Sequence, residues 1–168
     1  MKIYVASSWR NGFQQEVVRR LRAEHHEVYN FKAASHDPSA PPGGFHWSDI
    51  DPEWKAWVPS VFRKALNHPI ARAGFARDMT ALMECEACVL VLPCGRSAHL
   101  EAGYAAGAGK PTIVLLSDGE PELMYRMNTK ICCTLDEVVE ALADPIALVE
   151  IRDDIANAFA AIGRSVEH

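Results

Sequence analysis

Residues 88–116 read CVLVLPCGRSAHLEAGYAAGAGKPTIVLL, and the fold is decided within this stretch. Its ends, CVLVLP and PTIVLL, are continuous apolar runs, which are typical of central parallel strands covered on both faces of a sheet. Between them, a turn that contains Gly95 leads into a small-residue-rich segment over residues 98–109 that is expected to be helical. The stretch therefore predicts a strand, a helix and a second strand of an α/β sheet.

The same alternation continues on both sides of this stretch. The short connections near the N-terminus imply parallel strands joined by a right-handed crossover. We therefore expect residues 1–168 to form one α/β domain, a doubly wound, open parallel sheet of the Rossmann-like or flavodoxin-like type flanked by helices. Apolar spacing predicts further strands over residues 2–6 and 27–31, and helices over residues 13–24, 70–85, 135–143 and 153–162, with a short helix around residues 53–58.

Composition narrows the range of partners. The 168 residues include 17 basic and 22 acidic side chains, which gives a net charge of −5. This acidic balance offers no positive surface to a nucleic acid polymer or an anionic membrane, and no apolar run is long enough to span a bilayer. Five cysteines, an odd number, are typical of a reducing compartment. We therefore expect a cytoplasmic protein that binds small molecules.

The residues that follow each predicted strand are the candidates for ligand binding, because ligands bind beyond the carboxyl ends of the strands in such sheets. They lie at residues 7–11, 94–99 and 117–128. The turn at residues 94–97 opens a predicted helix, so its backbone amides and the helix dipole favour an anion. Arg96 adds a guanidinium group to that turn, and Ser97 adds a hydroxyl, both of which can bind an anion.

Two acidic residues could carry chemistry. Glu101 is expected in the first turn of the helix, where the dipole favours a carboxylate that could act as nucleophile or simply complement the dipole. Asp78 falls on a predicted inward face with Phe75, Leu82 and Cys85. A buried carboxylate needs a partner, so Asp78 either forms a salt bridge, for instance with Arg96, or meets substrate in a polar pocket. Two carboxylates at one pocket are the arrangement that cleaves glycosidic bonds.

These segments resemble a known family. The opening KIYVASSW, the later Asp78, and VLVLP followed by HLEAGYAAGAGKP together resemble the nucleoside 2-deoxyribosyltransferase superfamily, which includes nucleoside 5'-monophosphate N-glycosidases. The similarity covers residues 2–31 and 70–116. It implies that Glu101 attacks the anomeric carbon, that Asp78 contacts the sugar or base and shuttles the proton, and that Tyr4 orients the nucleophile. It implies no metal and no redox cofactor.

The resemblance also suggests how substrate is held. The position of Gly95 differs between branches of the family, because the residue there is acidic in nucleoside transferases and Ser in monophosphate hydrolases. Gly95 therefore leaves Arg96, Ser97 and His99 to define the pocket, and phosphate binding by Arg96 and Ser97 would indicate a nucleotide substrate. Asn128 or Tyr125 occupies the region that a neighbouring subunit supplies in the family, which implies a homodimer or a larger homo-oligomer with shared sites. The expected substrate-binding residues are Ser7, Trp9, Phe45, Trp47, Gly95, Arg96, Ser97 and Asn128.

A Trp- and Pro-rich insertion at about residues 32–69 lies outside the matched core. Three of the four tryptophans and six of the ten prolines fall between Pro38 and Pro69. Disordered segments are poor in aromatic residues, so this loop is expected to be ordered. Its rings either stack on a nucleobase, with Phe45 and Trp47 as the favoured contacts, or pack onto the sheet edge or a subunit interface. We expect this segment to determine the substrate preference of the protein.

Three functions are compatible with these residues. The first is hydrolysis or transfer at the N-glycosidic bond of a nucleoside or nucleoside 5'-monophosphate, with Glu101 as nucleophile. The second is a non-catalytic nucleotide-binding or sensor module that uses the same pocket. The third is an NAD glycohydrolase, since cleavage at the nicotinamide–ribose bond uses the same oxocarbenium chemistry. Cys85 and Cys88 have C-x-x-C spacing but are expected in the core. The side chain of His99 either faces the mouth of the pocket or has a structural role.

Overall fold

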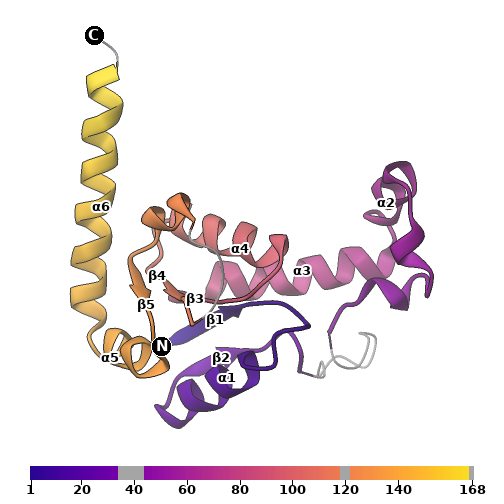
Figure 1. Cartoon of the computed structure of the whole chain (residues 1–168), viewed down its shortest axis with the longest axis horizontal. Helices are drawn as coiled ribbons and strands as arrows, with labels where there is room; N and C mark the ends of the chain where they lie inside the picture. Colours follow the sequence, from indigo (N-terminus) through magenta and orange to yellow (C-terminus); the bar gives the residue numbers. More distant parts are fainter. Residues whose placement is uncertain (34–43, 118–121, 167–168) are drawn as a thin grey trace. The chain divides into compact units, whose positions relative to one another are not determined.

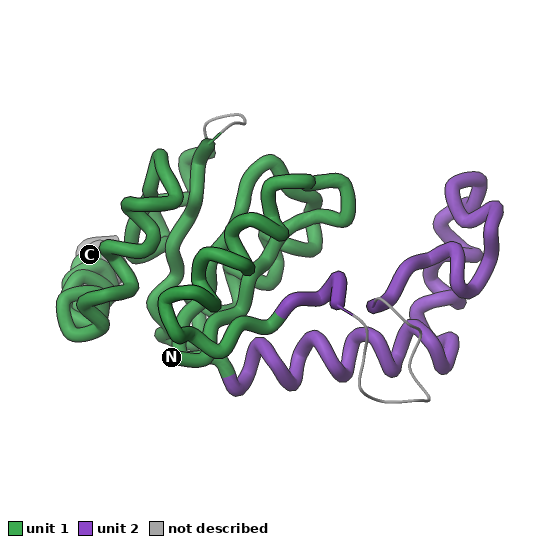
Figure 2. The backbone as a smooth tube through the Cα atoms, turned by 90° about the horizontal axis from the view of Figure 1, so that it is seen from below, with its two compact units in different colours: residues 1–29, 85–168 green, residues 30–84 purple. Residues whose placement is uncertain are grey.

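The computed structural model describes residues 1–33, 44–117 and 122–166. The chain divides into two compact units, coloured separately in Figure 2. Unit 1 comprises Met1–Tyr29 and Cys85–His168, and unit 2 comprises Asn30–Glu84. The predicted insertion at 32–69 falls within unit 2, and its residues 34–43 lie outside the described part of the chain.

Unit 1 is built on a parallel sheet, which confirms the predicted α/β class. In the described chain this sheet has five strands in the order β2-β1-β3-β4-β5, and every neighbouring pair is parallel. The central strands β1, β3 and β4 are apolar and almost wholly buried. The strands are β1 (Lys2–Ala6), β2 (Glu27–Tyr29), β3 (Ala87–Val91), β4 (Thr112–Leu115) and β5 (Lys130–Cys132).

Helices cover both faces of this sheet, because strand side chains alternate between the faces. Ile3, Val5 and Val89 point into the main core, which α1 (Gln14–Ala23) and α5 (Leu135–Ala143) close. The alternate strand residues, Tyr4 among them, lie on the opposite face, where α4 (Arg96–Gly107) packs on β1, β3 and β4. Figure 1 shows α1 and α5 on one side of the sheet and α4 on the other.

Two helices begin earlier than the sequence predicts by two residues or more. The last helix, α6 (Pro145–Val166), begins eight residues before the predicted 153, because proline suits the first turn and Asp144 Oδ1 accepts the Ala147 amide at 3.0 Å. Leu148 of α6 is buried in the core, and Arg152 donates to the Gly109 carbonyl at 2.6 Å. The helix α4 begins at Arg96, two residues earlier than expected.

In unit 2 the predicted insertion folds into short helices that precede one long helix. They are η1 (Trp47–Asp49), η2 (Trp54–Ala56) and α2 (Pro59–Ala65), followed by α3 (Pro69–Glu84). The inward face predicted for α3 is wrong at Phe75, which is 67% exposed, whereas Leu82 is buried. Asp78 is half-buried. In the described chain no helix combines the length and the apolar character that crossing a membrane would need.

Candidate functional site

The strand order reverses between β1 and β3, which is where ligands bind in sheets of this topology. Side chains that follow β1 tie its loop to the loop after β3. Ser7 Oγ donates to the Val91 carbonyl at 3.0 Å, and Asn11 Nδ2 donates to the carbonyls of Val91 and Pro93 at 3.3 and 3.1 Å. The edge is thus rigid. Because Ser7 gives its hydroxyl proton to Val91, it can only accept a hydrogen bond from a substrate.

The amino end of α4 opens at this edge. Gly95 is the N-cap residue, with an extended backbone, and no side chain of the described residues caps the helix there. Arg96 and Ser97 form the start of the first turn, and both side chains are exposed. A helix start of this kind can bind an anion, and that role of Arg96 and Ser97 stays a prediction.

Glu101 lies in the second turn of α4, not in the first turn as expected, because the helix begins at Arg96. The dipole effect falls off within the first turn, so it does not by itself keep Glu101 ionised. Ala98, Ala102 and Ala105 mark the buried stripe of α4, and Glu101 lies on that stripe and is half-buried. Glu101 therefore lies on the side of α4 that faces the sheet.

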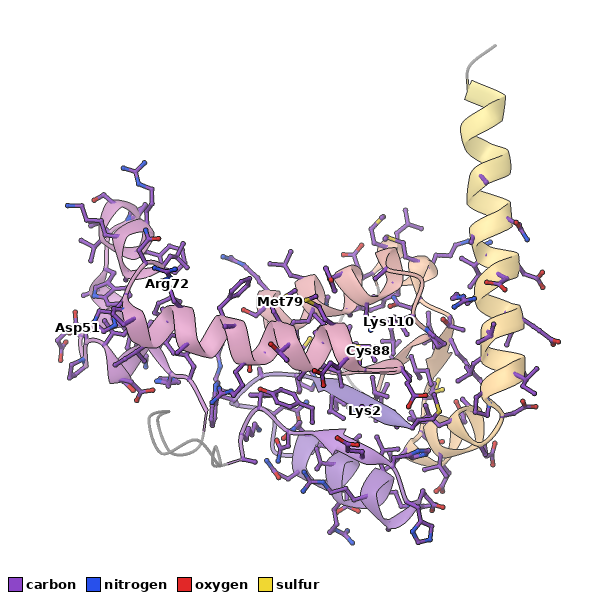
Figure 3. All side chains as sticks on the ribbon, turned by 180° about the vertical axis from the view of Figure 1, so that it is seen from behind. Lys2, Asp51, Arg72, Met79, Cys88 and Lys110 are labelled. Atoms are coloured by element: carbon purple, nitrogen blue, oxygen red, sulfur yellow. The ribbon has the colours of Figure 1, made fainter. Side chains whose placement is uncertain are left out.

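The electrostatic influence of Glu101 reaches the neighbouring thiols. Burial, and to a smaller extent the negative charge of Glu101, together raise the pKa of Cys94 to about 11. Burial also raises the pKa of Cys88. The charges of Cys85 and Glu101 raise this pKa as well, whereas the charge of Lys110 lowers it. Cys88 and Lys110 are labelled in Figure 3. At neutral pH Cys94 is consequently a protonated thiol and a poor nucleophile.

A hydrogen-bonded cluster of Cys94, His99 and Tyr125 lies beside Glu101. His99 Nδ1 is 3.0 Å from the Gly95 carbonyl and 3.5 Å from Cys94 Sγ, and its Nε2 is 2.9 Å from the Tyr125 hydroxyl. A carbonyl can only accept, so Nδ1 carries the proton of the neutral ring and Nε2 accepts from Tyr125. Burial raises the pKa of Tyr125, which keeps this hydroxyl a donor.

The sequence does not predict this cluster. Residues 94 and 125 lie on opposite sides of β4 in the chain, so no local pattern brings Cys94, His99 and Tyr125 together. A signal was present nonetheless. Cys94, Gly95 and His99 occupy the turn and first helical turn that were already identified as a ligand-binding edge.

Tyr4 and Asn128 are held by contacts within unit 1. Tyr4 is 1% exposed, and its ring stacks on that of Tyr29 with centroids 5.2 Å apart. Trp9, by contrast, is exposed in the loop after β1. Asn128 Nδ2 donates to the Tyr125 carbonyl at 3.0 Å, at the end of η3 (Leu123–Met127). Asn128 therefore sits beside the His99–Tyr125 pair within one chain.

Asn128 also lines a cavity of about 410 Å³ within unit 1. The cavity lies between the segment at residues 125–131 and the helix α6, whose Ile155 and Ala158 form part of its wall. That a neighbouring subunit supplies Asn128 or Tyr125 in this region stays a prediction.

The remaining predicted residues lie in unit 2. Asp78 Oδ1 is 3.6 Å from Nε of the adjacent Arg77, which is one ion pair of this carboxylate. A salt bridge with Arg96 and a contact with substrate, the two alternatives that the sequence leaves open, stay predictions. Trp47 lines an aromatic cavity, and Phe45 packs edge-on against Trp47 with centroids 4.8 Å apart. Phe45 is absent from that cavity's lining.

The described residues contain no group of three or more His, Cys, Asp or Glu side chains that could hold a metal ion. No protein-family model matches the sequence, and no curated protein matches it significantly. Among solved structures, the chain is similar to the crystal structure of a conserved protein from Enterococcus faecalis V583, with 14% identity and a TM-score of 0.47. The match covers 83% of this chain and 95% of that one. A likeness of this degree says nothing about activity.

Proposed function

We propose that this protein cleaves the N-glycosidic bond of a nucleoside or a nucleoside 5'-monophosphate, with Glu101 as the nucleophile. The observation that carries the proposal is the position of Glu101, half-buried on the sheet-facing stripe of α4 at the edge where the strand order reverses. The alternative nucleophile at this edge, Cys94, is protonated at neutral pH. The resemblance of the sequence to nucleoside 2-deoxyribosyltransferases supports the same assignment.

The reaction needs two carboxyl groups and water or a second base. A carboxylate oxygen of Glu101 attacks C1' of the sugar, the bond from C1' to the base nitrogen breaks, and its electron pair leaves with the base. The leaving base takes a proton from the acid, the role that the resemblance assigns to Asp78. Water, or a second base, then attacks C1' of the glycosyl ester, gives its proton back to that carboxylate and frees Glu101. The nearby carboxylate also stabilises the positive charge that develops on the sugar in both transition states.

The first test is base release by Glu101→Gln, which removes the charge and keeps the shape. Purified protein is incubated with nucleosides, their 5'-monophosphates and NAD, and free base is measured by liquid chromatography. We expect release to fall by more than about a thousandfold, because the variant lacks the group that forms the intermediate. Glu140→Gln, the same change at an exposed position of α5, should retain full activity.

Circular dichroism and thermal melting of both variants show whether the fold is intact. Full activity in Glu101→Gln would rule out this nucleophile. Release of nicotinamide from NAD, with none from nucleosides or monophosphates, would make the protein an NAD glycohydrolase. If no base is released from any compound while nucleotides raise the melting temperature, the protein is a binding module.

The second test concerns the proton given to the leaving base, which the resemblance assigns to Asp78. In Asp78→Asn we expect release of natural bases to fall by about 10²–10⁴-fold, the usual contribution of a general acid. A substrate with a nitrophenolate leaving group needs no protonation, so its cleavage should be nearly unchanged. Equal losses on both kinds of substrate would show that Asp78 is not the proton donor.

A further inference from the structure

Unit 2 contains an aromatic cavity that the proposed chemistry does not use. The cavity measures about 180 Å³ and is lined by Trp47, Trp54, Lys55, Trp57 and Phe62, all of which belong to the Trp-rich segment. Three of the four tryptophans of the chain thus surround one space. The three indoles are half-buried and Phe62 is 43% exposed, so the rings remain accessible to a ligand.

The rings around this cavity are held by contacts with one another. Trp47 meets Trp57 and Phe62 edge to face, with centroids 5.6 and 5.4 Å apart. The indole Nε1 of Trp57 donates to Asp51 Oδ2 at 2.6 Å, and this bond lowers the pKa of Asp51. Asp51 is labelled in Figure 3. Because Asp51 remains an ionised acceptor at neutral pH, the orientation of Trp57 is maintained.

The backbone that carries Trp47 is also fixed. His46 caps η1, because its Nδ1 accepts from the Ser48 amide while its own amide donates to Asp49 Oδ2 at 2.8 Å. Behind Trp47, Phe45 fills the space over Gly74 of α3, where an added Cβ would lie only 2.7 Å from Phe45 Cβ. A cavity whose walls are held in this way loses little entropy when a ligand binds.

The lining selects for one class of ligand. Indole faces attract planar rings and cations, but Lys55 places a positive charge in the wall, with its Nζ 5.9 Å from the Trp54 ring centroid. Asp51 keeps its negative charge, but its oxygens accept from Trp57 and from the Glu53 amide at 2.9 Å and the residue does not line the cavity, so the charged side chain of the lining is Lys55. The volume is below that of typical pockets for drug-sized ligands, so it suits a single planar ring system.

We propose that this cavity is a nucleotide-binding site, in which the base stacks on the indoles and the phosphate pairs with Lys55. The cavity and its preference for a planar anion follow from the residues of unit 2 alone. The choice of a nucleotide among planar anions rests on the proposed function. The site makes the Trp-rich segment a recognition element for the class of compound that Glu101 would cleave.

Tryptophan fluorescence tests the site directly, because three of the four emitters line it. Full-length Glu101→Gln protein is titrated with AMP, CMP and the matching nucleosides, with excitation at the red edge of indole absorption. We expect saturable quenching. Trp54→Leu should weaken binding of all four compounds at least about tenfold, the effect of losing one stacking ring. Lys55→Gln should weaken the monophosphates about fivefold and leave the nucleosides unchanged.

Two variants in the same unit control for general damage. Phe75→Leu removes an exposed ring of α3 that does not line the cavity, and Lys64→Gln removes an exposed charge of α2. Both should bind as the parent does. Absence of saturable quenching, quenching unchanged in Trp54→Leu, or tighter binding of tetramethylammonium than of AMP would each overturn the proposal.

The outcomes also separate this site from the proposed reaction. If Glu101→Gln loses base release but shows no quenching, the cavity proposal fails and the reaction stands. If that variant still cleaves substrate while quenching depends on Trp54 and Lys55, the nucleophile assignment fails and the nucleotide site stands.

Discussion

At the scale of single residues, Cys94 and Glu101 are coupled through their charges. The thiol of Cys94 has a pKa of about 11, first because it is buried and second because Glu101 is negative. The ordinary value is 9.0, so at a given pH below both values Cys94 carries about a hundredfold less thiolate than an unperturbed cysteine. Between pH 9.0 and about 11 the folded chain holds a proton that the unfolded chain releases, so this group lowers stability as pH rises there.

We predict that alkylation of Cys94 by iodoacetamide is slow near pH 8 and speeds up several-fold in Glu101→Gln. The thiolate is the reacting species, and removing the carboxylate removes one of the two causes of the raised pKa. Mass spectrometry of peptides gives the rate at each cysteine. The exposed Cys133 serves as an internal standard whose rate should be the same in both proteins. An unchanged rate at Cys94 would show that Glu101 does not act on it.

At the scale of elements, α3 has one position where only glycine fits. A Cβ at Gly74 would approach Phe45 Cβ to 2.7 Å and Phe45 Cγ to 2.9 Å, close to the backbone of that residue, where the side chain cannot swing away. Alanine favours a helix over glycine by up to about 1 kcal/mol. Overpacking costs typically about 1–3 kcal/mol, so the clash outweighs the gain.

We therefore predict that Gly74→Ala destabilises unit 2 by about 1–2 kcal/mol. Urea unfolding followed by tryptophan fluorescence measures this, because most of the tryptophans lie in unit 2. Gly103→Ala on α4 is the matched control. A Cβ there has no heavy atom within 4 Å among the described residues, so the change should stabilise by about 0.5–1 kcal/mol. In a Phe45→Gly background, which lacks both the ring and the Cβ that Gly74→Ala would strike, Gly74→Ala should no longer destabilise; a loss that persists would mean that Phe45 is not the cause.

At the scale of the whole molecule, the strand order brings distant segments to one edge. The loops after β1 and β3 are joined by hydrogen bonds from Ser7 and Asn11 to Val91, although some 80 residues separate them. Unit 2 is inserted between these segments in sequence, after β2 and before β3. The sheet edge therefore belongs to unit 1, and the aromatic cavity belongs to unit 2.

The predicted elements of the sheet unit agree closely with the structure where the apolar pattern is long. The strand over residues 2–6 and the helix over residues 135–143 match β1 and α5 in both bounds. β5 was not predicted, because Lys130–Cys132 is too short to display an alternating pattern. The start of α4 lies two residues before the predicted start because Gly95 offers no side-chain cap to mark it, and two residues are about half of a helical turn.

The sequence by itself determined the fold class, the edge of the sheet that carries polar residues and the segment that carries the aromatic rings. These are local properties, since the periodicity of apolar residues reports burial along one segment. Only the tertiary structure decided that His99 bonds Tyr125, that Asp78 pairs with Arg77, and that Trp47 lines a cavity while Phe45 supports it from behind. Such contacts depend on helix rotation and strand order, which follow from packing between segments rather than from the pattern within any one of them.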